Sequence, residues 1–355
     1  MIIAVAKQIL METGIMSTIR DVAALAKVSP ATVSRVLNHD TKYKMTDETI
    51  ERVWKAVAEL NYKAPSSSGD RLRPVRNPVR DSSAAHKFGC IMNVQGGKYN
   101  DPYYLTILSG FEKLIMEKGY DISFIRTNEE LEDPQILYKT FDEPVSGLII
   151  MNTLTDETFD YIRKQTPYIV GIDTAHDTID NVAYDHYGAA IMAVEHLYAQ
   201  GYREIGFIGG DESEMRRSRR FNGYFAALHG LDLCFNADWV LASGWDEEIC
   251  DRKIRKAYAE GKLPRAFFVA SDTMAIGALH TFFDLGLSVP EDIAVIGLSN
   301  IEISKYSNPP LSTIGLPIRE MGMVAADLLL GRIAGDTLPT RVVTLGAELI
   351  RRSST

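Results

Sequence analysis

Short apolar runs alternate with longer amphipathic segments over most of this chain, and this alternation limits the folds that it can adopt. The runs have the length of buried strands, as in FGCIMNV, GLIIMN, IGFIGG and AFFVAS. Between them lie segments with helical spacing, for example residues 105–118, 188–200 and 272–285. Strands that alternate with helices predict an α/β fold of doubly wound parallel sheets. So many strands need two sheets, hence two lobes, and a ligand is expected at the carboxyl ends of the strands.

The N-terminal part of the chain is organised differently. Its apolar residues predict three helices, at residues 19–26, 29–37 and 46–60. Ser29 and Thr46 are residue types that cap helix N-termini, and Pro30 suits the first helical position. The first two helices have the spacing of a helix-turn-helix, whose second helix enters the major groove of DNA. A generic helical hairpin is the alternative.

Charge and composition divide the chain further. Residues 1–80 carry a net charge of +5, whereas residues 81–355 carry −14. A basic head on an acidic body favours nucleic acid as a partner of the head. Pro, Ser and Arg dominate residues 64–87, which show no periodicity and are typical of a linker. We therefore predict a dispensable N-terminal extension (1–15), a helix-turn-helix domain (16–63), a linker or hinge (64–87) and a core of two lobes (88–355).

Other signals indicate what the chain is not. No long apolar run and no signal peptide is present, so we expect a soluble, cytoplasmic protein without a membrane partner. Cys90, Cys234 and Cys250 lie far apart and are expected to be reduced and structural. The dinucleotide fingerprint GxGxxG cannot occur, because no two glycines are separated by a single residue, and GxSxG, HExxH and P-loop motifs are absent. We expect neither an enzyme nor a bound metal or cofactor.

The stretches TIRDVAALAKVSPATVSRVLN and TDETIERVWKAVAELNYKA closely resemble the DNA-binding head of the lactose repressor family of bacterial transcription regulators. The resemblance covers residues 17–352, and the core of this family is similar to periplasmic sugar-binding proteins. It implies a homodimeric repressor of carbohydrate catabolic genes that binds a palindromic operator through two heads. A small sugar effector, bound between the core lobes, would control it.

The resemblance also implies DNA-contacting residues. Pro30 and Ala31 match base-reading positions, where they can offer only apolar contact, and Arg35 can pair with guanine through two hydrogen bonds. The residues expected to bind phosphates are Thr18, Ser29, Thr32, Ser34 and Asn38. Leu72 is the candidate for the hinge leucine that wedges into the minor groove. However, Gly69 and Asp70 are unfavourable within a hinge helix.

Sugars need planar polar groups for their hydroxyls and an aromatic face for their C–H surface. The positions that match the family's effector pocket supply such groups: Asn100, Tyr103, Tyr104, Asp173, Arg220, Trp245, Ser271, Asp272 and Ser299. Trp245 could instead belong to the core, and Asp272 could be only a helix N-cap. Many relatives carry an acidic pair where this chain has Ser299 and Asn300, so one sugar hydroxyl should be held less tightly.

Several stretches, among them NDPYYL, GFIGG and NPPLST, look most like family members that repress genes for galactoside use. Three alternatives stay open: a co-repressor-dependent regulator with a non-sugar effector, a sugar-binding transport protein, and an enzyme that acts on sugars. The transport protein would need a secretory signal and the enzyme a pair of catalytic carboxylates. Neither feature is recognisable in the sequence.

Overall fold

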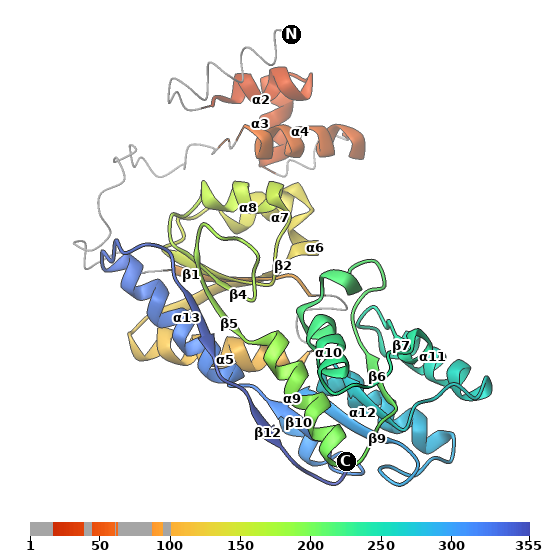
Figure 1. The fold of residues 1–355 in the computed structure, drawn as a ribbon. Coiled ribbons are helices and arrows are strands. Elements are labelled where there is room, and N and C mark those ends of the chain that lie inside the picture. The colour runs from red at the N-terminus through yellow and green to blue at the C-terminus, as the bar shows by residue number, and fades with distance from the viewer. Residues whose placement is uncertain (1–16, 39–44, 61, 63–86, 95–100) are drawn as a thin grey trace.

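A three-helix head and two α/β lobes make up the protein (Figure 1). The computed structural model describes residues 17–38, 45–60, 62, 87–94 and 101–355. The extension 1–15 and nearly all of the predicted linker 64–87 lie outside the described residues. Within the described part of the chain, none of the helices combines the length and the apolar character that spanning a bilayer requires.

The head contains α2 (Ile19–Ala26), α3 (Pro30–Leu37) and α4 (Asp47–Glu59). Each helix begins after a hydroxylated cap, because the side chains of Thr18, Ser29 and Thr46 accept hydrogen bonds from backbone N–H groups of the first turn. Apolar residues of all three helices, including the fully buried Val22, Val33 and Val57, form one small core. The predicted helices and their caps are therefore confirmed.

The first lobe, here called the N-lobe, is built on a six-stranded parallel sheet with the order β11-β5-β4-β3-β1-β2. Its strands are β1 (Lys87–Met92), β2 (Asp121–Thr127), β3 (Gly147–Met151), β4 (Ile169–Ile172), β5 (Asp180–Tyr184) and β11 (Val342–Leu345). Its helices are α5 (Pro102–Glu117), α6 (Asn128–Leu131), α7 (Pro134–Thr140), α8 (Asp156–Arg163) and α13 (Ile318–Ile333).

Alternate residues of the N-lobe strands pack on opposite faces of the sheet. Phe88, Cys90 and Met92 of β1 join the cluster under α5 and α13, whereas Ile91 joins the cluster under α7 and α8. The helices α5 and α13 approach very closely, since a Cβ atom at Gly322 would collide with the backbone of α5. The face with α7 and α8 lies toward the head (Figure 1).

The second lobe, the C-lobe, has a six-stranded sheet with the order β12-β10-β9-β8-β6-β7, in which only the pairing of β12 with β10 is antiparallel. Its strands are β6 (Ile205–Ile208), β7 (Val240–Leu241), β8 (Ala266–Val269), β9 (Ala294–Ser299), β10 (Ser312–Gly315) and β12 (Glu348–Ile350). Its α-helices are α9 (His186–Ala199), α10 (Arg219–Gly230), α11 (Glu247–Ala259) and α12 (Asp272–Asp284). Three short 3₁₀ segments, η2 (Met215–Arg217), η3 (Ala237–Trp239) and η4 (Glu302–Lys305), lie in its loops.

The two lobes are joined where the chain passes from β5 to α9, from β10 to α13 and from β11 to β12. Helices cover both faces of the C-lobe sheet, with α9 and α10 on one face and α11 and α12 on the other. This arrangement confirms the predicted fold of a head and two doubly wound lobes. It also brings the carboxyl ends of the parallel strands of both lobes toward one region.

Candidate functional site

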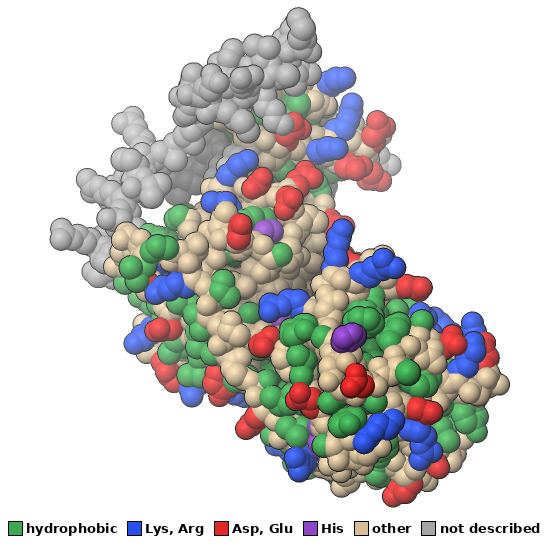
Figure 2. All heavy atoms as spheres, viewed as in Figure 1, with side chains coloured by type: hydrophobic (Ala, Val, Ile, Leu, Met, Phe, Trp, Pro, Cys, Tyr) green, Lys and Arg blue, Asp and Glu red, His purple; other side chains and the backbone are tan. Residues whose placement is uncertain are grey.

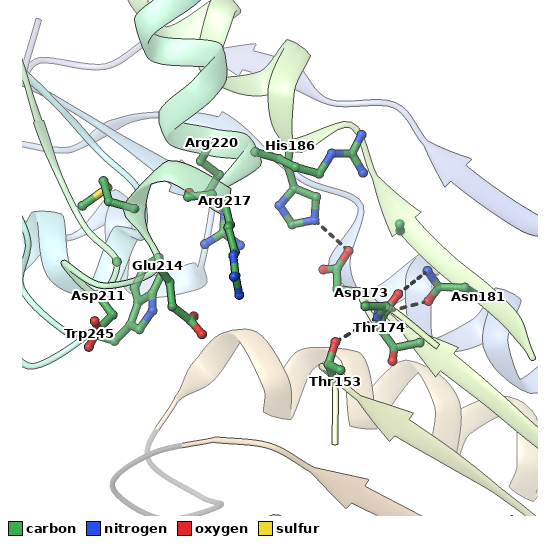
Figure 3. A pocket seen from close by; sticks show the side chains of 16 residues that line it. Thr153, Asp173, Thr174, Asn181, His186, Asp211, Glu214, Arg217, Arg220 and Trp245 are labelled. Carbon is green, nitrogen blue, oxygen red and sulfur yellow. Dashed lines mark hydrogen bonds and ion pairs between the residues drawn. The ribbon is translucent and has the colours of Figure 1, made fainter. Parts of the chain in front are cut away.

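A cavity of about 500 Å³ lies between the lobes (Figure 3). Its lining comes from loops that follow parallel strands: Thr153 follows β3, Asp173 follows β4, His186 follows β5, Gly210 follows β6 and Trp245 follows β7. The remaining lining residues are Thr174, Ala175, Asn181, Ala183, Asp211, Glu214, Met215, Arg217, Ser218, Arg219 and Arg220. The cavity therefore lies at the strand ends where open α/β sheets bind ligands.

Arg220, in the first turn of α10, faces the N-lobe residues across the cavity (Figure 3). Its Nε donates a 2.8 Å hydrogen bond to the hydroxyl of Tyr184. Its guanidinium carbon also lies 5.2 Å from the ring centre of Trp245, within the range of a cation–π contact. Burial by itself would lower the pKa of Arg220, but Tyr184, Tyr103 and Asp173 outweigh it and raise this pKa. The side chain is a permanent cation with donors left for a ligand.

Asp173 lies opposite Arg220, and its side chain is 8% exposed. One carboxylate oxygen accepts a 3.0 Å hydrogen bond from the hydroxyl of Tyr103, and the other lies 2.8 Å from Nε2 of His186. Burial lowers the pKa of His186, although its bond to Asp173 acts in the opposite direction. His186 also stacks on Tyr184, with 3.8 Å between ring centres. One connected polar network thus spans both lobes.

This network and its neighbour Trp245 provide three kinds of ligand contact. The carboxylate of Asp173 accepts hydrogen bonds, the guanidinium of Arg220 donates them, and Trp245, a residue that is 40% exposed, offers an aromatic ring. The backbone of Trp245 has a positive φ of 61°, as does that of Asp173 with 51°. Backbone strain of this kind at two cavity residues is common where loops are shaped for a ligand.

Of the other residues predicted for the effector pocket, those that the structure describes do not line this cavity. Tyr103 donates a hydrogen bond to the cavity residue Asp173. Its ring packs edge-on against that of Tyr104, whose hydroxyl accepts a 2.6 Å hydrogen bond from Asn152. Ser271 is the residue before α12, and Ser299 ends β9 with 7% exposure. Asn100 lies outside the described residues.

Asp272 has a different environment from the one predicted. Its carboxylate accepts a 2.6 Å hydrogen bond from the hydroxyl of Thr313 and a 3.0 Å bond from the backbone N–H of Ile301. Only 1% of the residue is exposed, and burial raises the pKa of Asp272 to about 6. Nor does it cap α12, because the N-cap residue is Ser271. In this structure, Asp272 ties α12 to β10 and to the loop after β9.

Two residues of the network were missed by the sequence reasoning, namely His186 and Tyr184. Both lie at the carboxyl end of β5, where a ligand was expected in general, but the resemblance did not point to these two positions. The segment before α10 was missed as well, and it contributes Asp211, Glu214 and Arg217 to the lining. Asp211 follows the predicted strand IGFIGG directly, whereas Glu214 and Arg217 lie further along a charged segment without apolar periodicity.

Most of the described DNA-binding candidates lie on α3 or at its two ends, whereas Thr18 is exposed at the N-cap of α2. Ser29, Pro30 and Ala31 are exposed, and Arg35 is partly buried one turn further along. The side chain of Ser29 accepts from the N–H of Thr32, and the amide of Asn38 donates to the carbonyl of Ser34. Leu72, the predicted wedge, lies outside the described residues.

A helix-turn-helix head together with a cavity between two α/β lobes defines the class of ligand-responsive DNA-binding proteins. Among the residues described, no group of His, Cys, Asp or Glu is arranged to hold a metal ion. Residues 18–65 match the family of bacterial regulatory proteins of the lacI type, and residues 194–355 match a periplasmic binding protein-like domain.

Comparison with known proteins agrees over nearly the whole chain. The HTH-type transcriptional repressor PurR of Aliivibrio fischeri is 32% identical over 347 residues, which is 96% of this chain and 98% of that protein. The repressor MelR of Bacillus subtilis is 33% identical over 350 residues, or 96% of this chain and 97% of MelR. The chain belongs to the lacI family, and it is a DNA-binding transcriptional repressor rather than an enzyme.

Solved structures support the same architecture. The lac repressor dimer bound to operator and the anti-inducer ONPF has a TM-score of 0.66 and 25% identity, and the match covers 95% of this chain and 98% of that one. A complex of the transcriptional regulator CelR with cellobiose has a TM-score of 0.69 and 24% identity, with 96% and 100% covered.

Proposed function

We propose that this repressor senses a small sugar of the galactoside class in the cavity between its lobes, and that it controls genes for carbohydrate catabolism. The observation that carries the proposal is the arrangement of Asp173, Arg220 and Trp245. A carboxylate, a guanidinium and an indole face are the groups that hold the hydroxyls and the C–H surface of a sugar ring. The cavity of about 500 Å³ has the size of a small-molecule site.

Two further observations support a sugar. The CelR structure of similar fold carries cellobiose, a disaccharide. The galactoside class rests on the resemblance of NDPYYL, GFIGG and NPPLST to repressors of galactoside use, and on the neutral pair Ser299 and Asn300 after β9. An effector without hydrogen-bonding groups would leave unused the Arg220 N–H donors that do not bond to Tyr184 and the remaining lone pairs of Asp173, which is costly at a buried site.

Control follows from the position of the cavity. Asp173 belongs to the N-lobe, whereas Arg220 and Trp245 belong to the C-lobe. A ligand that contacts all three favours the lobe arrangement in which they are close together. A coupling of about 1 to 3 kcal/mol between sugar and operator would change operator affinity roughly 5- to 150-fold.

A homodimer is the assembly that we propose for operator binding, because two heads related by a two-fold axis match a palindromic DNA site. The C-lobe carries three exposed apolar side chains, Phe283, Ile303 and Tyr306, which are 73%, 56% and 76% exposed. Phe283 lines a groove whose other lining residues include Ser307 and Asn308, next in the sequence to Tyr306. Large exposed apolar side chains of this kind favour burial against another surface. We propose a second copy of this chain as the partner.

A thermal-shift screen tests the sugar. The full chain is heated with galactose, galactosides, glucosides and, as the non-sugar arm, free nucleobases and nucleosides. Stabilisation by a galactoside supports the proposal, and stabilisation by another sugar class corrects only the specificity. Stabilisation by a nucleobase alone would overturn the sugar effector and favour the co-repressor-dependent alternative. Operator binding is then measured with and without the stabilising compound, because the direction of the change distinguishes induction from co-repression.

A further inference from the structure

The head packs directly on the N-lobe through helices α4 and α7. Trp54, on α4, is only 3% exposed, although it lies on a helix of a small, separate three-helix core. The ring of Tyr138, on α7, completes its burial, with 5.3 Å between the two ring centres and 52° between their planes. Tyr138 is the residue of the N-lobe that packs against the apolar cluster of the head. Figure 1 shows α4 above α7 and α8.

Tyr62, just after α4, belongs to the same contact. It is 5% exposed, and burial together with the neighbouring Tyr138 raises the pKa of its hydroxyl. Trp54 and Tyr62 thus both belong to the apolar cluster of the head against which Tyr138 packs. The exposed residues Ser29, Pro30 and Ala31 at the start of α3 stay outside this contact, so docking leaves the DNA-reading end of α3 accessible.

The helices α7 and α8 of the N-lobe also pack near residues that line the cavity. His176 follows the cavity residues Asp173, Thr174 and Ala175, and it stacks on Phe159 of α8 with 3.7 Å between ring centres. Phe159, Leu137 and Phe141 share one buried cluster. Leu137 precedes Tyr138 on α7, so packed side chains connect the loop after β4 with the surface on which the head rests.

We propose that α7 is a docking surface for the DNA-binding head, and that the contact between Trp54 and Tyr138 positions the head for operator binding and couples it to the cavity. A head that is held by its own lobe loses less freedom when it binds DNA than a head joined by a linker alone. The positioning does not depend on the identity of the effector. The coupling does, and to that extent it rests on the proposed function.

The first test replaces Tyr138 rather than Trp54, because Trp54 also belongs to the core of the head and its loss would destabilise the head itself. An operator is selected from random DNA with the wild-type full chain. Its affinity is then measured without effector for wild type, Tyr138→Ala, Tyr138→Phe and the distant control Tyr258→Ala. We expect Tyr138→Ala to weaken binding about three- to tenfold, the range to which a lost aromatic pair corresponds. Tyr138→Phe keeps the ring and should lose much less affinity than Tyr138→Ala.

Hydrogen exchange of the full chain supplies a readout that a general loss of stability would not produce. In Tyr138→Ala, exchange should become faster in residues 47–60 and stay unchanged in residues 266–285 of the C-lobe. Equal operator affinity of Tyr138→Ala and wild type would overturn the proposal. So would a loss that Tyr138→Phe or Tyr258→Ala shares, or unchanged exchange in α4.

The second test addresses coupling and uses the compound that stabilises the protein in the thermal-shift screen. At concentrations that saturate both proteins, this compound should change operator affinity less in Tyr138→Ala than in wild type. An undiminished effect in Tyr138→Ala would overturn the coupling. If no sugar binds, the proposed function fails, but the effector-free measurements still decide whether α7 positions the head.

Discussion

Replacement of Arg220 by alanine should abolish most of the sugar affinity of this repressor. The substitution removes the guanidinium that donates to Tyr184 over 2.8 Å and that lies 5.2 Å from the ring centre of Trp245. It also leaves the carboxylate of Asp173 without the cation that it faces. A hydrogen bond to a charged group contributes about 1.5 to 3 kcal/mol, so sugar binding should weaken roughly 10- to 150-fold.

Isothermal titration of wild type, Arg220→Ala and Arg216→Ala with the sugar identified by thermal shift measures this loss. Arg216 is a matched control, because it lies four residues away on the same segment but does not line the cavity. The loss of the partner of Tyr184 should lower the free energy of unfolding by about 1 kcal/mol, which thermal unfolding without sugar reveals. Equal sugar affinity of Arg220→Ala and wild type would refute the assignment of the site.

Three further predictions concern other parts of the molecule. Arg35→Ala should weaken specific operator binding by about 1 to 3 kcal/mol and affect random DNA much less; equal losses would mean that Arg35 contacts only phosphate. Residues 88–355 should sediment as a dimer without the head, and Tyr306→Asp should produce monomers; a monomeric wild-type core would contradict this. Because burial raises the pKa of Asp272 to about 6, the folded state retains a proton that the unfolded chain releases. The stability that this proton contributes is fully present below about pH 4 and is lost as the pH rises through about 6. Between about pH 4 and 7, the free energy of unfolding of Asp272→Asn should therefore increase by about 2 to 3 kcal/mol relative to that of wild type. A difference between the two proteins that does not vary with pH would refute the titration.

Features that depend on neighbours in the sequence were predicted well. The hydroxyl caps Ser29 and Thr46 were recognisable because a cap bonds to the backbone only a few residues away. The resemblance to the lactose repressor family, not a local pattern, pointed to Asp173 and Trp245, and in the structure both follow strands and line the cavity. The alternation of strands and helices was sufficient for the two lobes.

Features that depend on distant partners were not predictable in this way. The sequence left open whether Asp272 binds the effector or caps a helix, whereas in the structure it bonds to Thr313 and to the backbone of Ile301. The contact of Trp54 with Tyr138 joins two segments of the chain that no periodicity relates. Such pairs are determined by how the lobes and the head pack, and only the folded chain reveals them.

Operator occupancy as a function of sugar concentration tests the central claim most directly. Full-length wild type and Arg220→Ala are titrated with the sugar on a selected operator. If the cavity holds the effector, occupancy changes with sugar for wild type, falling for an induced and rising for a co-repressed repressor, while Arg220→Ala shows no change over the same range. An identical sugar response of both proteins, or no response of wild type to any sugar that stabilises it, would contradict the claim that sugar in this cavity controls DNA binding.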